Sequence, residues 1–495
     1  MIKLWMSEGF AKITGEANPP AELNNAFAIQ MAKNESESCH VTLNSDTDLS
    51  GITLRQVTPD GNGLTVETLE EYLICTETGH YPDPIVPLTG GFDVKAGVNK
   101  SILIRFVSTE DTVAGEHTYV FELINADGTV ISDVTVNVKV WNFVLPMELG
   151  CATAGDIRYP HIIRHEKLDP NDKETIEAYY KNYYDLMIKY KFSPHGLPYD
   201  ILDPRADEYM SNPQVTGFRV DYKVDDETLV KYYEKLKTNP VWLNKSYIYV
   251  YDEPNDVNAL NILKERCERF KVLCPEIPVL VAFFRNVPYD ENRDQIDFMN
   301  EYVNVFCAKS AAWKPGWLRD DLKRGYFGDR MDALKPDGNK VWWYVCWEPG
   351  YPYCNMYVNE IGLQHRELFW QQYHYNSDGF LYWALNHWGE IENTWVDMAN
   401  VKSLSPHVYG DGSVMYPGYN VGIKGGVASI RMECIRDGVE DFDMLKLAEK
   451  YLGREFIEEQ IAKVTPTLTE HTLNNAEFAE ARKIIGDALE AAINK

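Results

Sequence analysis

The chain has 495 residues, 45% of them hydrophobic and 25% charged, and it carries a formal net charge of −27. A chain of this length is expected to form two or three domains with sizeable apolar cores. Its acidity argues against binding to nucleic acid or to an anionic membrane surface, because phosphate groups would repel it.

Targeting and cofactor motifs are not apparent. The first 16 residues contain no continuous apolar segment of the kind found in a secretory leader. No apolar run approaches the roughly 18 residues of a membrane-spanning helix. The nine cysteines form no CxxC pair, and the glycine-containing turns lack the spacing of a phosphate-binding loop. We therefore expect a cytoplasmic protein that uses no cofactor and has no membrane partner.

Residues 1–147 read as an all-β domain. Short β-branched or aromatic runs such as "GITLRQV", "KSILIRFVS" and "HTYVFELIN" alternate with the turn sequences "DGNG", "ADGT" and "KAGVNK". Strands of this length, separated by turns at this spacing, are typical of a β-sandwich.

Residues 148–495 instead alternate strand patterns with helical patterns. Apolar runs that alternate with helices indicate parallel strands buried on both faces, and eight of them indicate a (β/α)8 barrel. Amphipathic helices then end the chain. The eight candidate strands are residues 150–159, 192–198, 217–222, 246–253, 277–284, 302–309, 340–347 and 378–386.

Functional groups of such a barrel lie where the strands end. The predicted strand ends collect acidic, basic, amide and aromatic side chains, which together form the kind of cleft that binds a sugar. We therefore expect a carbohydrate as the partner. The candidate residues are Arg158, His195, Asp252, Glu253, Trp343, Tyr344, Trp383, Asn386 and Trp388.

The adjacent acids Asp252 and Glu253 in "YVYDEP" are the candidate catalytic pair. Neighbouring strand residues point to opposite faces, so both can serve one cavity only if the chain turns there, which Pro254 favours. A retaining glycosidase usually needs two carboxyl groups about 5–5.5 Å apart that flank the scissile bond. Adjacent residues do not flank a bond easily, so a substrate that supplies its own 2-acetamido nucleophile fits better. Asp252 would then polarise the amide, and Glu253, with its pKa raised by Asp252, would protonate the leaving oxygen.

Other patterns favour structural roles. A strand-ending turn is the simplest alternative for "DEP". His161 and His165 have the spacing of metal ligands on a helix, but Pro160 makes a helical face there improbable, so we expect no metal site. The charged stretch at residues 431–445 places its apolar residues on one helix face. We expect its charges, Arg431, Glu433, Arg436 and Asp437, to form ion pairs that hold the helix.

The chain resembles glycoside hydrolase family 123, the β-N-acetylgalactosaminidases, and related proteins that share their barrel. The resemblance rests on "AKNESESCHVTL" and "HYPDPIVPL" in the first domain, and on "YVYDEP", "VWWYVC", "GFLYWALNHW", "GDGSVMYPG" and "IRMECIRDGVEDFDML" in the second. The last of these is the most specific, because it is long and unusual in composition.

The resemblance implies hydrolysis of a terminal β-linked N-acetylgalactosamine or a related N-acetylhexosamine, with retained configuration and assistance from the acetamido group. It implies that Asp252 orients the amide and that Glu253 is the general acid and base. Tyr344 is the candidate donor to the acetamido oxygen, and Trp343 or Trp383 the wall beside its methyl group. The remaining candidates, His195, Arg158, Asn386 and Trp388, follow from their strand-end positions.

Two competing functions stay open. A glycosidase of other specificity would use Glu253 with a distant carboxylate nucleophile, for which Glu348, Glu390 and Glu392 are the candidates. A non-catalytic glycan-binding protein would use the aromatic cleft only to hold sugar.

Overall fold

The computed structural model describes residues 1–314, 327–401 and 408–495. The chain forms two compact units. The first unit contains Met1–Met147, Met356–Trp370 and His387–Lys495, and the second contains Glu148–Asn355 and Gln371–Asn386. The two units are defined by contacts between residues, and each contains more than one segment of the chain. The predicted division into domains at residues 1–147 and 148–495 therefore stays a prediction.

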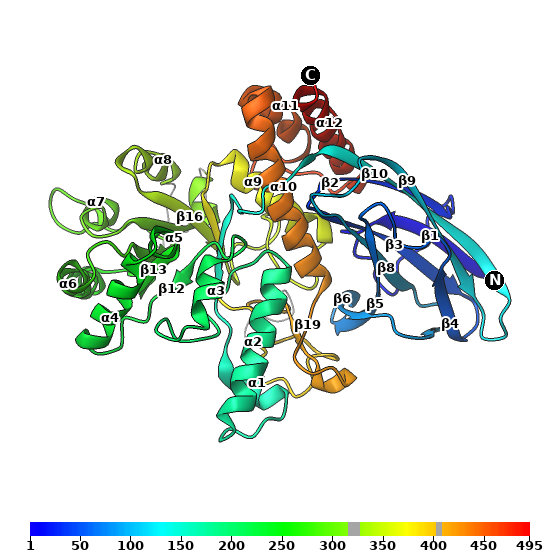
Figure 1. Ribbon diagram of the computed structural model, residues 1–495, viewed down its shortest axis with the longest axis horizontal. Helices are drawn as coiled ribbons and strands as arrows, with labels where there is room; N and C mark the ends of the chain where they lie inside the picture. Colours follow the sequence, from blue (N-terminus) through cyan, green and yellow to red (C-terminus); the bar gives the residue numbers. More distant parts are fainter. Residues whose placement is uncertain (315–326, 402–407) are drawn as a thin grey trace. The chain divides into compact units, whose positions relative to one another are not determined.

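The first unit begins with ten strands in two five-stranded sheets (Figure 1). One sheet has the order β1-β3-β8-β5-β6 and the other has the order β2-β10-β9-β4-β7. The predicted sheet-rich first region is therefore confirmed. The strands are β1 (Ile2–Glu8), β2 (Ala26–Lys33), β3 (Ser36–Ser45), β4 (Leu49–Gln56), β5 (Thr65–Thr76), β6 (Gly79–Pro87), β7 (Phe92–Val94), β8 (Lys100–Val107), β9 (Gly115–Ile124) and β10 (Val130–Val144).

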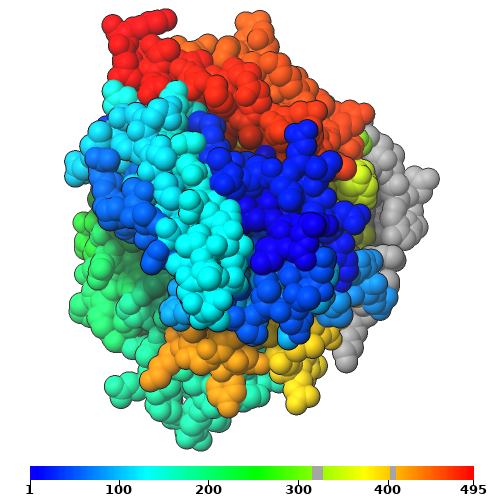
Figure 2. All heavy atoms as spheres, turned by 90° about the vertical axis from the view of Figure 1, so that its right-hand side faces the viewer, coloured from blue at the N-terminus to red at the C-terminus, as the bar shows by residue number. Residues whose placement is uncertain are grey.

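Alternate residues of both sheets form one apolar core, for example Val41 of β3, Ile104 of β8 and Val136 of β10, all fully buried. The last helices belong to the same unit, and α12 packs on β10 and α10 (Figures 1 and 2). These elements are α9 (Gly362–His374, which begins in this unit), α10 (Ile430–Leu452), α11 (Arg454–Val464), α12 (Asn475–Ile493), the short strands β18 (Tyr416–Pro417) and β19 (Gly426–Val427), and the 3-10 turn η5 (Tyr419–Val421).

The second unit is built on a parallel sheet of seven strands in the order β11-β17-β16-β15-β14-β13-β12. Its strands curve around an interior filled by side chains such as Tyr247, Leu280, Cys307 and Trp342. The strands are β11 (Ala152–Gly155), β12 (Phe218–Arg219), β13 (Ser246–Asp252), β14 (Val279–Phe283), β15 (Val305–Lys309), β16 (Lys340–Val345) and β17 (Gly379–Tyr382).

Helices connect these strands, and α4 and α6 lie on the outer side of the sheet (Figure 1). Aspartate caps begin three of the longer helices: Asp172 accepts from Thr175, Asp225 from Thr228 and Asp256 from Ala259. None of the described helices is long and apolar enough to cross a membrane. The helices are α1 (Tyr159–His165), α2 (Lys173–Lys189), α3 (Ala206–Ser211), α4 (Asp226–Lys237), α5 (Pro240–Lys245), α6 (Val257–Leu273), α7 (Gln295–Met299) and α8 (Gly328–Asp332), with 3-10 turns η1 (Ser310–Trp313) and η3 (Lys335–Asp337).

Seven of the eight predicted barrel strands form, but the strand predicted at residues 192–198 does not. Pro194 and Pro198 have no amide hydrogen and cannot extend a hydrogen-bonded ladder there. The irregular segment still bridges the two edge strands. The His195 amide donates to the Gly155 carbonyl (2.6 Å), and the Arg219 amide donates to the His195 carbonyl (2.7 Å).

One local prediction about the loop after β11 is wrong. Residues 159–165 form helix α1 although Pro160 lies within them. Proline is tolerated in the first helical turn because the amide hydrogens there have no partner in the helix. The His161 and His165 rings stack with their centroids 6.4 Å apart.

Candidate active site

The end of β13 contains a β-bulge that sets the direction of Asp252. Tyr249 pairs with Leu280 and Tyr251 pairs with Val281, so Val250 is an extra residue in this strand. Because strand residues alternate between faces, the extra residue reverses the face of every residue after it. Asp252 therefore pairs with Ala282, a member of the interior core, and faces the inside of the curved sheet.

The next residue, Glu253, leaves the strand in a left-handed conformation, with φ of +51°. Its amide still donates to the Ala282 carbonyl (2.9 Å). A residue with a Cβ atom adopts this conformation at a cost of about 1–2 kcal/mol, so the surroundings must hold it. The fully buried Gln295 of α7 does part of this, because its Nε2 donates to the carbonyl of Pro254 (3.1 Å).

Two tyrosine hydroxyls hold the two carboxylates. The Tyr249 hydroxyl donates to Oδ1 of Asp252 (2.7 Å), and the Tyr344 hydroxyl donates to Oε1 of Glu253. Burial, reinforced by the neighbouring carboxylate, raises the pKa of each tyrosine well above its usual value, so both stay protonated donors. Within the described residues neither acid forms an ion pair, and Asp252 is exposed while Glu253 is half-buried.

Lys309, which the sequence analysis missed, is the last residue of β15, two strands away from β13 in the sheet. Lys309 of β15 pairs in register with Tyr344 and is only 3% exposed. Its Nζ lies 3.8 Å from Oε2 of Glu348 and 5.7 Å from the ring centre of Trp347. The alternation of Val305 and Cys307, both in the interior core, would have predicted that Lys309 also points inward.

Trp383 and Arg158 lie together at the interior core of the curved sheet. Trp383 packs against the interior core, and the Arg158 guanidinium lies 4.9 Å from its ring centre. Asn386 is fully buried, and its side chain forms two hydrogen bonds with the backbone of Arg158. Its Oδ1 accepts from the amide (2.7 Å), and its Nδ2 donates to the carbonyl (3.2 Å). Asn386 therefore positions Arg158 and presents no exposed amide of its own.

His195 lies inside the sheet rather than at its open end. It is 2% exposed, and its Nδ1 is hydrogen-bonded to the Tyr247 hydroxyl (2.6 Å). Burial, together with the charge of Arg219, lowers the pKa of His195 to about 3. The ring is therefore neutral, and it is too deeply buried to contact a substrate.

The structure does not bring two predicted tryptophans to the strand ends. Trp343 is fully buried and follows Trp342 of the interior core, so it points to the opposite face of β16 from Tyr344. Trp388 is also fully buried, belongs to the first unit, and donates from its indole nitrogen to the Met415 carbonyl (2.8 Å). Of the two tryptophans predicted to lie beside the acetamido methyl group, Trp383 packs against the interior core, as Tyr344 does, and Trp343 does not.

The predicted ion pairs of the charged helix do form, within the first unit. Arg436 pairs with Glu433 (2.6 Å) and with Asp437 (2.5 Å), and Arg431 pairs with Asp83 (2.7 Å), all in the interior. These charges neutralise one another, which supports the structural role predicted for residues 431–445.

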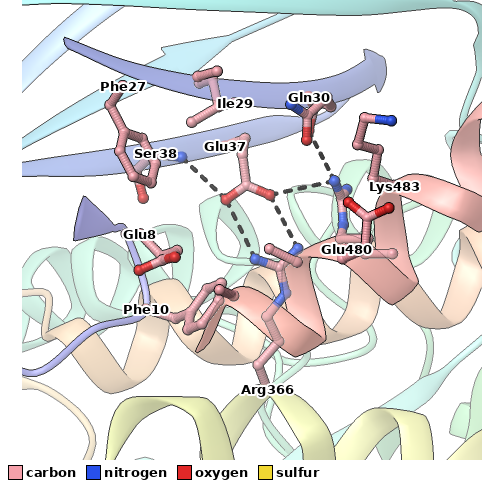
Figure 3. A pocket seen from close by; sticks show the side chains of 15 residues that line it. Glu8, Phe10, Phe27, Ile29, Gln30, Glu37, Ser38, Arg366, Glu480 and Lys483 are labelled. Carbon is pink, nitrogen blue, oxygen red and sulfur yellow. Dashed lines mark hydrogen bonds and ion pairs between the residues drawn. The ribbon is translucent and has the colours of Figure 1, made fainter. Parts of the chain in front are cut away.

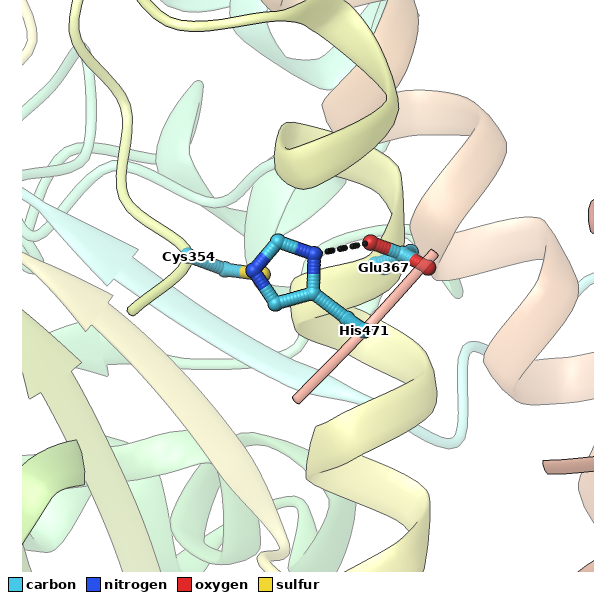
Figure 4. A group of neighbouring side chains, drawn as sticks. All are labelled: Cys354, Glu367 and His471. Atoms are coloured by element: carbon cyan, nitrogen blue, oxygen red, sulfur yellow. Dashed lines mark ion pairs between the residues drawn. The ribbon is translucent and has the colours of Figure 1, made fainter. Parts of the chain in front are cut away.

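Two other contacts between titratable side chains lie within the first unit. Glu37 and Arg366 line a cavity of about 230 Å³, and Nη2 of Arg366 donates to Oε2 of Glu37 (3.0 Å). Figure 3 labels both side chains. Nδ1 of His471 lies 3.2 Å from Oε2 of Glu367, the contact drawn as a dashed line in Figure 4. Burial raises the pKa of Glu367 to about 7, against the opposing effect of His471.

Comparisons with known proteins identify the class. The family model of the glycoside hydrolase 123 catalytic domain matches residues 175–448. The chain is therefore a glycoside hydrolase, with its paired carboxylates at the end of a parallel strand. It belongs to glycoside hydrolase family 123.

One solved structure shares the fold, and a second is similar over part of the chain only. A family 123 glycoside hydrolase from Clostridium perfringens, studied for glycolipid glycan hydrolysis, matches with a TM-score of 0.69 at 13% identity, over 100% of this chain and 98% of that chain. A putative β-galactosidase from Bacteroides fragilis matches with a TM-score of 0.25 at 12% identity, over 71% of this chain and 53% of that one. A comparison with curated proteins gives no match.

Proposed function

We propose that this glycosidase releases a terminal β-linked N-acetylhexosamine, most specifically N-acetylgalactosamine, by a retaining mechanism in which the substrate's acetamido oxygen attacks the anomeric carbon. The observation that carries the proposal is the end of β13. A bulge and one left-handed residue set the directions of two adjacent carboxylates, each held by a different tyrosine.

Asp252 is the proposed partner of the acetamido N–H. Its second oxygen, Oδ2, is left for the substrate, since Oδ1 accepts from Tyr249. A carboxylate that accepts from the N–H raises the electron density on the amide oxygen and helps that oxygen attack the anomeric carbon. The product of this step is a bicyclic oxazolinium ion, which water then opens from the face that the leaving group has vacated.

Glu253 is the proposed general acid and base. It gives its proton to the departing glycosidic oxygen and then accepts a proton from the attacking water. In the free protein the single hydroxyl proton of Tyr344 is committed to Glu253. We therefore propose that Tyr344 first orients Glu253, and that it reaches the acetamido oxygen only when Glu253 releases it. Trp383 is the proposed wall beside the acetamido methyl group.

We also propose that the second unit is a (β/α)8 barrel in which one strand is replaced by an irregular segment. Residues 192–198 take the place of the missing strand, and the two backbone hydrogen bonds of His195 support this closure. By analogy with the Clostridium perfringens enzyme, we propose the glycan of a glycolipid as a substrate.

A distant carboxylate nucleophile is the alternative mechanism. Glu348 is its candidate within the second unit, because its Oε2 lies 3.8 Å from Lys309 Nζ, the lysine that ends β15. Glu390 and Glu392 belong to the first unit. An enzyme of this kind would not depend on the 2-acetamido group.

Two nitrophenyl glycosides test the proposal. The wild type should cleave the β-N-acetylgalactosaminide and leave the matched β-galactoside, which lacks the acetamido group, uncleaved. Glu253→Gln should lose most activity on a substrate with a poor leaving group and much less on an activated one. Equal cleavage of both sugars would favour the alternative nucleophile. Sugar binding without any turnover would favour a non-catalytic glycan-binding protein.

A further inference from the structure

A cleft of about 540 Å³ lies on the second unit, just beyond the carboxyl ends of β11, β12 and the irregular segment between them. Its volume falls within the roughly 300–1,000 Å³ that is typical of small-molecule sites. The lining combines one exposed aromatic ring, that of Tyr159, with the charged side chains of Lys173, Glu177, Asp200 and Asp221. The reaction steps proposed above make no use of these residues.

The cleft and the carboxylate pair lie on neighbouring parts of one rim of the sheet. Strand β12, which leads to Asp221, pairs with β13, which leads to Asp252 and Glu253. The His195 ring, from the irregular segment, lies 5.6 Å from the ring of Tyr249, whose hydroxyl holds Asp252. Because parallel strands end at the same rim, a glycan whose terminal sugar reaches Glu253 can extend along this rim into the cleft.

The Tyr159 ring forms a platform that is fixed in place from below. It stacks on the buried ring of Tyr180, with ring centres 4.1 Å apart and ring planes 2° from parallel. The Tyr180 hydroxyl donates to the Gly196 carbonyl (3.2 Å), and a Cβ atom on Gly196 would lie only 2.8 Å from that hydroxyl. Helices α1 and α2, which carry the two tyrosines, lie side by side (Figure 1). Because Tyr180 covers one face of Tyr159 and the residue is 41% exposed, the other face is open to a ligand.

Two exposed carboxylates line the cleft together with this platform. In the described ranges of the chain, Asp221 accepts one hydrogen bond, from the Lys223 amide to Oδ1 (3.0 Å). Asp200 accepts from the Leu202 amide at Oδ1 (2.8 Å) and from the Tyr232 hydroxyl at Oδ2 (2.5 Å). A carboxylate has about four acceptor sites, so both side chains can still accept hydrogen bonds from the hydroxyl groups of a ligand.

The charge of the lining disfavours an anionic ligand. Glu177 is paired with Arg205, whose Nη1 donates to its Oε1 (2.8 Å). Of the other charged groups of the lining, Asp200 and Asp221 are acidic and Lys173 is basic, so the net charge is negative. A neutral sugar suits such a cleft, because its apolar face can stack on an aromatic ring while its hydroxyls donate to carboxylates. A sulfate or carboxylate group on the sugar would be repelled.

We propose that this cleft binds the sugar to which the terminal N-acetylhexosamine is attached, and that this sugar is neutral. The inference rests on the proposed function, since an enzyme that removes a terminal residue has the rest of the glycan on the leaving-group side only. The sugar stacks on Tyr159 and donates hydrogen bonds to Asp200 and Asp221. The cleft thus selects the leaving sugar, whereas the carboxylate pair acts on the terminal one.

Three kinds of substrate test the cleft in the wild type. The first is the β-azide of N-acetylgalactosamine, whose leaving group has no ring. The second is a panel of disaccharides in which N-acetylgalactosamine is β-linked to each hydroxyl position of methyl galactoside, and the third is the best of these with a sulfate on the galactose. Release of N-acetylgalactosamine gives kcat/KM for each.

The neutral disaccharide should be cleaved with a kcat/KM about 10-fold above that of its sulfated form at low ionic strength, and added salt should narrow the difference, because salt screens the repulsion. A sulfated disaccharide that is cleaved equally well or better would overturn the neutral ligand class. A difference that salt leaves unchanged would overturn the charge argument.

Variants of Tyr159 connect the effect with the platform. Tyr159→Ala should lower kcat/KM about 10-fold more on the neutral disaccharide than on the azide, and Tyr159→Phe, which keeps the ring, should restore most of the difference. Asp221→Asn should reduce the preference for the neutral disaccharide over the sulfated one. Tyr302→Ala is the matched control and should keep the wild-type ratios. Tyr302 also packs on an aromatic ring, that of Phe298 (5.4 Å), but it precedes β15 at the opposite edge of the sheet.

The outcomes separate this inference from the proposed function. A wild type that cleaves the azide and the disaccharide, with a ratio that Tyr159→Ala leaves unchanged, keeps the function and loses the cleft. A wild type that binds the disaccharide in calorimetry and loses that binding in Tyr159→Ala, but cleaves neither substrate, keeps the cleft and loses the function. Neither binding nor cleavage would overturn both.

Discussion

The Tyr344 hydroxyl donates its hydrogen bond to Glu253 from a strand three places away in the parallel sheet, across the interior from β16 to β13. Burial raises the pKa of Tyr344 well above its usual value, so the hydroxyl stays protonated and remains a donor. The orientation of Glu253 thus depends on a side chain 91 positions later in the sequence.

Tyr344→Phe should therefore reduce kcat/KM by about 10- to 100-fold, because Glu253 loses a charge-assisted hydrogen bond that orients it. The loss should be smaller for an activated aryl glycoside, which needs little acid assistance. Steady-state kinetics on two leaving groups measures this. Equal losses on both would show that Tyr344 serves something other than proton donation.

Tyr249 and Asp252 should behave as one unit. Tyr249→Phe removes the donor to Oδ1 of Asp252 and should lower kcat/KM about tenfold. In the Asp252→Asn background the same change should have little further effect, since the carboxylate that Tyr249 orients is gone. The four proteins of this double-mutant cycle measure the coupling. Additive losses would mean that the hydrogen bond does not serve the reaction.

The left-handed conformation of Glu253 predicts a difference between two inactive variants. Glu253→Gly and Glu253→Ala both delete the carboxylate, but only alanine keeps the Cβ atom that disfavours φ of +51°. The glycine variant should be more stable than the alanine variant by roughly 1 kcal/mol, the reverse of the usual order. Urea denaturation compares them. A more stable alanine variant would show that this conformation is not maintained.

Burial of His195 predicts a pH dependence of stability. Its pKa is about 3 in the folded protein and about 6.5 in an unfolded chain, so between these values only the unfolded chain binds the proton. The free energy of unfolding should therefore fall as the pH drops below about 6.5, by at most about 1.4 kcal/mol per pH unit from this group.

His195→Gln should remove that contribution, which denaturation at pH 7, 6 and 5 would show as a flatter profile than that of the wild type. His117→Gln, a histidine on strand β9 of the other unit, is the matched control and should keep the wild-type slope. An unchanged slope in His195→Gln would place His195 in a solvated environment.

Sequence patterns predicted the parts of the fold that depend on local periodicity. Apolar runs located seven of the parallel strands, and the spacing of apolar residues located α2, α4 and α6. The failed strand at residues 192–198 contains Pro194, and its place between β11 and β12 depends on tertiary hydrogen bonds that a local pattern cannot show. The helix at Tyr159–His165 differs from the prediction because Pro160 lies in its first turn, where proline does not break a helix.

The candidate site was predictable in part. "YDEP" located the carboxylates, because functional groups of a barrel lie where its strands end. The bulge at Val250 could not be predicted, since it is visible only in the pairing of β13 with β14. Trp343 and Tyr344 are adjacent, and only the register of the interior core shows which of them faces inward. Lys309 ends its strand, and the inward alternation of Val305 and Cys307 is the signal that indicates its direction.

The most direct test of the central claim is the affinity of the wild type and Asp252→Asn for the thiazoline of N-acetylgalactosamine, a stable mimic of the cyclised intermediate. If the acetamido oxygen is the nucleophile and Asp252 holds the amide, the wild type should bind the thiazoline at least about 100-fold more tightly than N-acetylgalactosamine itself, and Asp252→Asn should lose most of that advantage. A wild type that cleaves the glycoside but binds the thiazoline no better than the parent sugar would contradict the account.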